Sequence, residues 1–145
     1  MSETASRPPR EVAPPGGAEP PAEVMLDGEW VDLRLLAREI SARFVAETPA
    51  YAERYGEHAL AWCEHDCRHV LGWAFSEHEG WVDLGAQVAW LARVLAARDF
   101  PLEWLARDME LAADVVAEQL SAHGNALARR LREVAGEVRR PAGHG

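Results

Sequence analysis

The chain contains no lysine, only two cysteines, and no apolar run long enough to span a bilayer. Its fifteen basic residues are all arginines and face 24 acidic residues. The resulting net charge of −9 argues against a nucleic-acid surface, which needs clustered positive charge. The N-terminus lacks the apolar stretch of a signal peptide. We therefore expect a cytoplasmic protein with no membrane partner and no nucleic-acid partner.

The two cysteines, Cys63 and Cys67, are too few for a disulfide framework. They stand four residues apart on a predicted helix, where both Cβ atoms lean toward the helix N-terminus and a bridge between them would be strained. The neighbouring acids Glu64 and Asp66 oppose thiolate formation. We expect both to be reduced thiols that serve mainly as small apolar side chains.

Composition divides the chain into three parts. Residues 1–29 hold most of the prolines and few large apolar side chains, which predicts a disordered tail. Residues 30–140 are long enough for one hydrophobic core and form the expected domain. Residues 141–145 are expected to be a flexible C-terminus.

Apolar residues recur at helical spacing through the domain, and helix-start signals precede them. Asp32 and Asp83 suit N-caps, and Pro49 and Pro101 open helices. No segment shows the alternation of a strand, so no strand is predicted. The pattern predicts an all-α, single-domain bundle of about five helices, globin-like or four-helix-bundle-like. The expected helices cover residues 33–47, 49–79 with a bend at Gly56, 84–98, 102–123 and 126–138.

Several residues outside the central helix have simple structural interpretations. Trp30 and Trp81, in two copies of Trp-Val-Asp-Leu, are expected to cover the ends of the bundle. Trp90 and Trp104 lie beside leucine stripes and are expected in the core. Asp108 is expected on a solvated face. Residues 125–145 carry five arginines and two acids, so this last helix either lies in solvent or docks on the acidic body or an acidic partner.

The central helix has two faces of different chemistry. One is an ordinary core stripe that includes both cysteines. The other lacks the usual surface charges and carries three imidazoles and two indoles. Its members are His58, Trp62, His65, His69 and Trp73.

Several interpretations of this imidazole and indole face compete. Burial of each indole against another helix or a second subunit yields a gross gain of about 4–6 kcal/mol, so packing or a protein contact needs no ligand. A planar tetrapyrrole could instead lie against the indoles. His65 and His69 have the spacing of two metal ligands on a helix, with a further ligand drawn from Asp66, His78 or His123. Thiol chemistry at Cys63 or Cys67 is the remaining alternative.

Two motifs resemble known families. Cys63-x-x-Asp66, with Tyr51–Gly56 upstream, resembles the chromophore helix of phycobiliproteins, which are globin-like. That resemblance implies a bilin on Cys63 whose pyrrole nitrogens contact Asp66, although His65 stands where the family has arginine. His65-x-x-x-His69 is similar to the metal-binding helix of DinB-like bundles. The Trp62-Cys63-x-His65-Asp66 core and the run Leu105-Ala-Arg-Asp108 are similar to small helical proteins of actinobacteria, a resemblance that implies no activity.

No phosphate-binding glycine loop, nucleophile elbow or paired-carboxylate signature is evident. The sequence thus favours a non-enzymatic regulatory or protein-interaction module, with a protein partner or a second copy bound to the central helix 57–79. The expected contact residues are Trp62, His65, His69, Trp73, His58, Cys63 and Asp66. The alternative is a tetrapyrrole- or metal-binding bundle, either a sensor or a DinB-like metalloenzyme.

Overall fold

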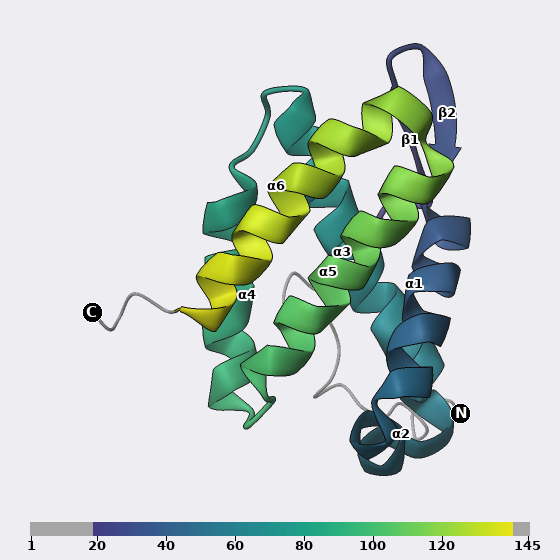
Figure 1. The fold of residues 1–145 in the computed structure, drawn as a ribbon. Helices are drawn as coiled ribbons and strands as arrows, with labels where there is room; N and C mark the ends of the chain where they lie inside the picture. The colour runs from purple at the N-terminus through teal and green to yellow at the C-terminus, as the bar shows by residue number, and fades with distance from the viewer. Residues whose placement is uncertain (1–18, 141–145) are drawn as a thin grey trace, which may run out of the picture.

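The computed structural model describes residues 19–140 and confirms an all-α bundle (Figure 1). Its N-terminal part also contains a small two-stranded sheet. No helix in residues 19–140 is long and apolar enough to cross a membrane. The elements are β1 (Glu23–Leu26), β2 (Glu29–Asp32), α1 (Leu33–Glu47), α2 (Pro49–Tyr55), the short 3-10 helix η3 (Gly56–His58), α3 (Ala59–His78), α4 (Leu84–Ala97), α5 (Leu102–Gln119) and α6 (Ser121–Arg139).

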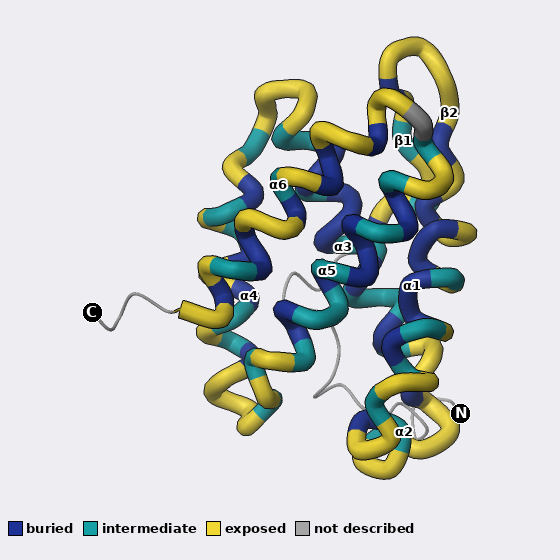
Figure 2. The backbone as a smooth tube through the Cα atoms, viewed as in Figure 1, coloured by how far each residue is buried: buried dark blue, intermediate teal, exposed yellow. Residues whose placement is uncertain are grey.

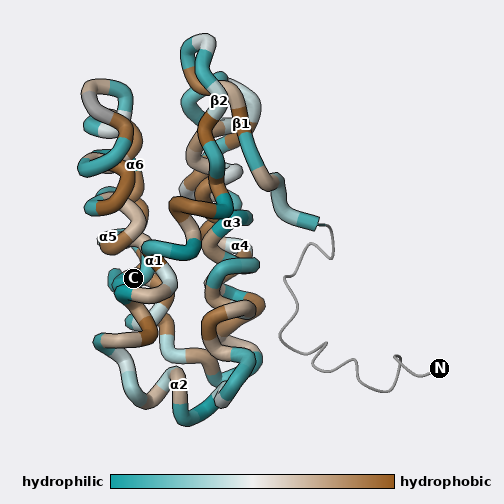
Figure 3. Tube along the Cα trace, turned by 90° about the vertical axis from the view of Figure 1, so that its right-hand side faces the viewer, coloured by the Kyte–Doolittle hydropathy of each residue, from teal (hydrophilic) through white to brown (hydrophobic). Residues whose placement is uncertain are grey.

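The helices form two layers around one core. Helices α5 and α6 pack closely along their length, while α3 and α4 stand in the other layer (Figure 3). Helix α1 packs against both α3 and α5 and closes one side of the bundle. The buried residues line the inward faces of these helices (Figure 2). The largest fully buried side chains include Phe44, Leu33, Ile40, Leu71, Leu84, Leu91, Met109 and Leu131.

The first four predicted helix starts and the predicted bend are confirmed. The Asp32 carboxylate accepts hydrogen bonds from the amides of Arg34 and Leu35, at 2.9 and 3.2 Å, and so caps α1. Asp83 caps α4 in the same way. Gly56 has a φ of 57°, a left-handed value that a glycine adopts readily, and it separates α2 from α3.

The expectation of no strands and of a tail reaching residue 29 is wrong for the described residues. Strands β1 and β2 pair antiparallel, with Val24 opposite Val31. The two-residue turn Asp27-Gly28 has positive φ at both positions, the geometry that favours tight hairpins. Leu26 and Val31 join the core. The rest of the predicted tail, residues 1–18, and the predicted flexible end, 141–145, lie outside the described residues.

The predicted boundary between the last two helices is also wrong. Helix α5 ends at Gln119, and α6 has already begun at Ser121, so Gly124 lies inside α6 rather than ending a helix. A Cβ atom on Gly124 would lie 2.3 Å from the Val116 carbonyl oxygen. The glycine is therefore required for the close approach of α5 and α6.

Three tryptophans are more exposed than expected. Trp30 and Trp81 are 67% and 78% exposed, so they do not cover the bundle ends. Trp90 is 37% exposed because it stands on the outer side of α4. Trp104 is partly buried and packs against the core, as expected.

The arginines of α6 dock on the acidic body. Arg130 donates to Glu77 of α3 at 2.9 Å, and Arg132 donates to Asp114 of α5 at 2.9 Å. Arg139 contacts Glu103 and Glu110 of α5. Of the alternatives for this basic helix, internal docking is the one that the structure supports.

Candidate functional site

The imidazoles and indoles of α3 line up along its outer side and contact one another. Trp62 stacks on His58 at 4.8 Å between ring centroids and meets Tyr55 edge-on at 5.4 Å. His65, His69 and Trp73 follow, each 5.5 to 6.0 Å from the next. His58 lies in η3 rather than in α3, and it is exposed. The other four residues are partly buried.

Part of this side of α3 is covered by the chain itself. Arg68 donates hydrogen bonds to the carbonyl oxygens of Pro20 and Pro21, at 3.0 and 3.3 Å. Pro21 packs on Gly72, where a Cβ atom would lie 2.8 Å from the proline Cγ. Glycine at this position lets residues 19–22 lie directly against the helix. The surface left for a partner on α3 is smaller than the sequence indicates.

Replacement of Gly72 by alanine is expected to lift residues 19–22 from α3. The Leu33 amide donates to the Ala22 carbonyl oxygen at 2.9 Å and reports on this segment. Its hydrogen exchange should rise about tenfold in Gly72→Ala. Gly136→Ala, whose new methyl group would meet only the Arg140 side chain, is the control. Unchanged exchange at Leu33 in Gly72→Ala would show that the segment is held elsewhere.

The structure does not bring the proposed metal ligands together. His78 and His123 lie instead beside Asp27 of the hairpin turn, at 4.0 and 2.6 Å from its Oδ2 atom. No three His, Cys, Asp or Glu residues among residues 19–140 are placed to hold a metal ion. Burial, with His69 and Arg68 nearby, lowers the pKa of His65 and favours its neutral form.

Both cysteines are buried free thiols. Burial is the main cause that raises their pKa values well above normal, and the Asp108 carboxyl group adds to it. A thiol in such surroundings is not activated as a nucleophile. This agrees with the expected packing role. Cys63 also points its Sγ atom toward Asp108 Oδ1, at 3.7 Å.

A buried acidic pocket is the feature that sequence reasoning missed. Asp66 of α3 and Asp108 of α5 line a pocket of about 30 Å³. Asp108 had been expected in solvent. Burial raises the pKa of each aspartate to about 7, and for Asp66 the nearby Asp108 adds to the effect. The aromatic walls are Phe44, Tyr51, Phe100 and Trp104.

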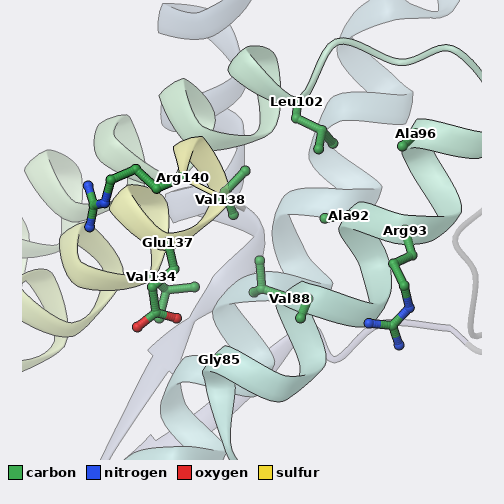
Figure 4. Close-up of a pocket in the computed structure, with 11 residues that line it drawn as sticks. Gly85, Val88, Ala92, Arg93, Ala96, Leu102, Val134, Glu137, Val138 and Arg140 are labelled. Atoms are coloured by element: carbon green, nitrogen blue, oxygen red, sulfur yellow. The ribbon is translucent and has the colours of Figure 1, made fainter. Parts of the chain in front are cut away.

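A much larger groove lies between α4 and α6 (Figure 4). Its volume is about 700 Å³, within the range of small-molecule ligand sites. Val88 of α4, Val138 of α6 and Leu102 of α5 project into it, while Arg93 and Arg140 lie at its rim. Neither arginine forms an ion pair with an acid in residues 19–140. The remaining lining residues are Gly85, Ala89, Ala92, Ala96, Val134 and Glu137.

This groove was also absent from the sequence-based candidates. In the sequence, the two helices that form its walls look like ordinary amphipathic helices, and a groove exists only because they stand apart in the fold.

Comparisons of the chain with family models, with curated proteins and with solved structures found no match.

Proposed function

We propose that the chain is a cytoplasmic, non-enzymatic regulatory module that binds an amphipathic helix of a protein partner in the α4–α6 groove. The open apolar groove between these two helices carries the proposal. Peptide helices commonly dock with their apolar face in such a groove. This proposal retains the regulatory module expected from the sequence, but it assigns the contact surface to α4 and α6 instead of α3.

The shape of the groove fits a helix. On α4 its wall runs from Gly85 to Ala96, eleven residue steps, or about 16 Å along the helix axis. That length corresponds to about three turns of a partner helix. The α4 wall includes glycine and three alanines, whose small side chains allow two helix backbones to approach closely. On the opposite side of the bundle α1 packs against α3 and α5, so this fold already accommodates a helix between its two layers.

The charges at the rim indicate the flanks of the partner helix. Arg93 of α4 and Arg140 of α6 stand on opposite walls and have no acidic partner in residues 19–140. Glu137 lies close to the guanidinium group of Arg130, which is itself paired with Glu77. A helix with an apolar face and acidic residues on both flanks would therefore match the groove.

The proposal is tested with a synthetic helical peptide of fourteen residues that has a leucine face and glutamate flanks. Isothermal titration should show binding to the wild-type protein. Ala92→Glu, which places a charge on the apolar wall, should weaken binding at least tenfold, or about 1.4 kcal/mol. Ala86→Glu puts the same charge on the exposed side of α4 and should leave binding unchanged.

A second pair of variants separates this groove from the face expected from the sequence. Trp62→Ala and Trp73→Ala remove the indoles of α3 and should not affect the peptide. If they abolish binding while Ala92→Glu does not, the contact face lies on α3 and the groove proposal is wrong. Binding of a scrambled peptide as tightly as the amphipathic one would also contradict it.

A further inference from the structure

We propose that the pocket between Asp66 and Asp108 binds the ammonium group of a short alkylamine. This site is separate from the α4–α6 groove and takes a different class of ligand. It combines a buried carboxylate oxygen without a hydrogen-bond partner, a second acid on the facing helix, and aromatic walls.

The unpartnered oxygen shows that the pocket lacks a donor. Asp66 Oδ1 is buried and makes no hydrogen bond, and protein atoms surround the carboxyl group almost completely. Across the pocket, Asp108 receives only a long contact from the Cys63 thiol, a weak donor. Buried polar groups are normally paired, so a donor that enters this pocket would satisfy both acids.

The local charge balance favours a single positive charge. Arg98, at the end of α4, is close enough to lower the pKa of Asp66 electrostatically. When both acids are ionised, Arg98 offsets their negative charge only in part, and the charge that remains suits a monovalent cation. A divalent metal ion would need more ligands than the described residues bring together here.

The walls suit an organic cation. The Tyr51 ring lies 5.1 Å from Phe44, 5.4 Å from Trp104 and 6.3 Å from Phe100, between centroids. Aromatic rings attract cations. The protein already uses the outer side of this cluster in this way, because the Arg54 guanidinium lies 6.0 Å from the Trp104 ring.

The size of the pocket limits the ligand. A water-sized group needs about 10–15 Å³ of such space, so a pocket of about 30 Å³ holds about two non-hydrogen atoms. An ammonium group with one attached carbon fits, whereas tetramethylammonium does not. Phe100, Trp104, Asp66 and Asp108 each keep part of their surface exposed although the Asp66 carboxyl oxygen is covered, so the pocket lies just below the molecular surface.

Binding should be coupled to proton release. Asp66 faces Asp108 of α5, Arg98 after α4, Tyr51 and Tyr55 of α2, and Cys63 of its own helix. The aspartates must lose their protons to attract the cation. Affinity should therefore rise between pH 6 and pH 8 by about tenfold for each aspartate that loses its proton in this range.

The test uses methylammonium chloride with the full chain at pH 8, and sodium chloride at equal ionic strength as reference. A saturable rise in Tm of about 6 °C is expected at twenty times the Kd. Asp66→Asn and Asp108→Asn keep the side-chain shape but remove the charge, and each should lose the rise. Backbone amide resonances of Asp66 and Asp108 should shift in the wild-type protein only.

Two further ligands, compared with methylammonium, define what the pocket accepts. Tetramethylammonium should have no more effect than sodium, because it exceeds the pocket. Lysine blocked at its amino and carboxyl groups tests whether the side chain of a partner protein's lysine can supply the ammonium group in place of a free amine. Binding of methylammonium or of the blocked lysine supports the site. Equal effects of sodium, tetramethylammonium and methylammonium, or binding that survives both asparagine variants, would overturn the proposal.

Discussion

Raising the pH from 5 to 8 is expected to lower the free energy of unfolding by about 5 kcal/mol. Asp66 and Asp108 have pKa values of about 7 in the folded protein against 3.8 in a model peptide. The folded state therefore binds more protons than the unfolded state between these values, and stability falls as the pH rises through this range. A tenfold change in proton affinity is worth about 1.4 kcal/mol, and about two such steps lie between pH 5 and the folded pKa values near 7, so each aspartate accounts for about 2.7 kcal/mol of the expected loss.

Urea unfolding at pH 5, 6, 7 and 8 measures this effect. The double variant Asp66→Asn/Asp108→Asn should be nearly insensitive to pH over the same range, because its amides do not titrate. It should also be more stable than the wild-type protein at pH 8. Stability that is constant or rising from pH 5 to pH 8 in the wild-type protein would refute the buried pair.

Acid should destabilise the protein for a different reason. Ion pairs with arginine lower the pKa values of Glu47, Glu103, Glu110 and Glu118. Groups of this kind stabilise the fold above their normal pKa values and lose that contribution as the pH falls through the folded ones. These pairs are mostly exposed, so each contributes little. Together with the aspartates, they place the maximum of stability near pH 5.

Gly124→Ala is expected to destabilise the protein by about 3 kcal/mol, the cost of overpacking at a site that cannot relax. The new methyl group would lie 2.3 Å from the Val116 carbonyl oxygen and 3.0 Å from its carbon. Both atoms belong to the backbone of α5, so no side-chain rotation can relieve the contact. The closely packed α5–α6 pair would have to separate.

The matched control is Gly136→Ala, in the same helix. Its methyl group would meet only the flexible Arg140 side chain at 3.4 Å, and alanine is favoured over glycine within helices by about 1 kcal/mol. This variant should therefore be slightly stabilised. Chemical denaturation of the two variants gives the comparison, and equal stabilities would show that α5 and α6 do not approach as closely as described.

The helices could be predicted because their signals are local. Asp32 and Asp83 occupy the N-cap positions that their sequence context indicates, and Gly56 interrupts the predicted helix where a bend was expected. The hairpin was missed although Asp27-Gly28 is a strong turn signal. Its strands have only four residues each and adjoin a proline-rich segment, so composition outweighed the turn.

The sequence does contain a pattern that predicts the burial of both aspartates. Asp108 falls in the apolar stripe of α5, three residues after Leu105 and just before Met109. Asp66 stands in the same position relative to Cys63 and Cys67 on α3. An acid inside an apolar stripe predicts burial. What no local pattern supplies is that the two acids face each other, because they are 42 positions apart and meet only through the packing of α3 and α5.

The groove between α4 and α6 was less predictable still. Its apolar residues continue the core stripes of two separate helices, and the distance between those helices depends on every other contact in the bundle. The outer side of α3 is the opposite case, because the sequence drew attention to it. Its unusual composition was evident, but packing of His58 on Trp62 and of Pro21 on Gly72 accounts for part of it within one chain.

The most direct test of the proposed helix-binding function is a measurement of nuclear Overhauser effects between the bound fourteen-residue peptide and the methyl groups of the protein. Contacts from the peptide leucines to Ala89, Ala92 and Val138 are predicted, since these residues line the groove. Contacts only to the rings of Trp62 and Trp73, or none to the methyl groups of α4 and α6, would contradict it.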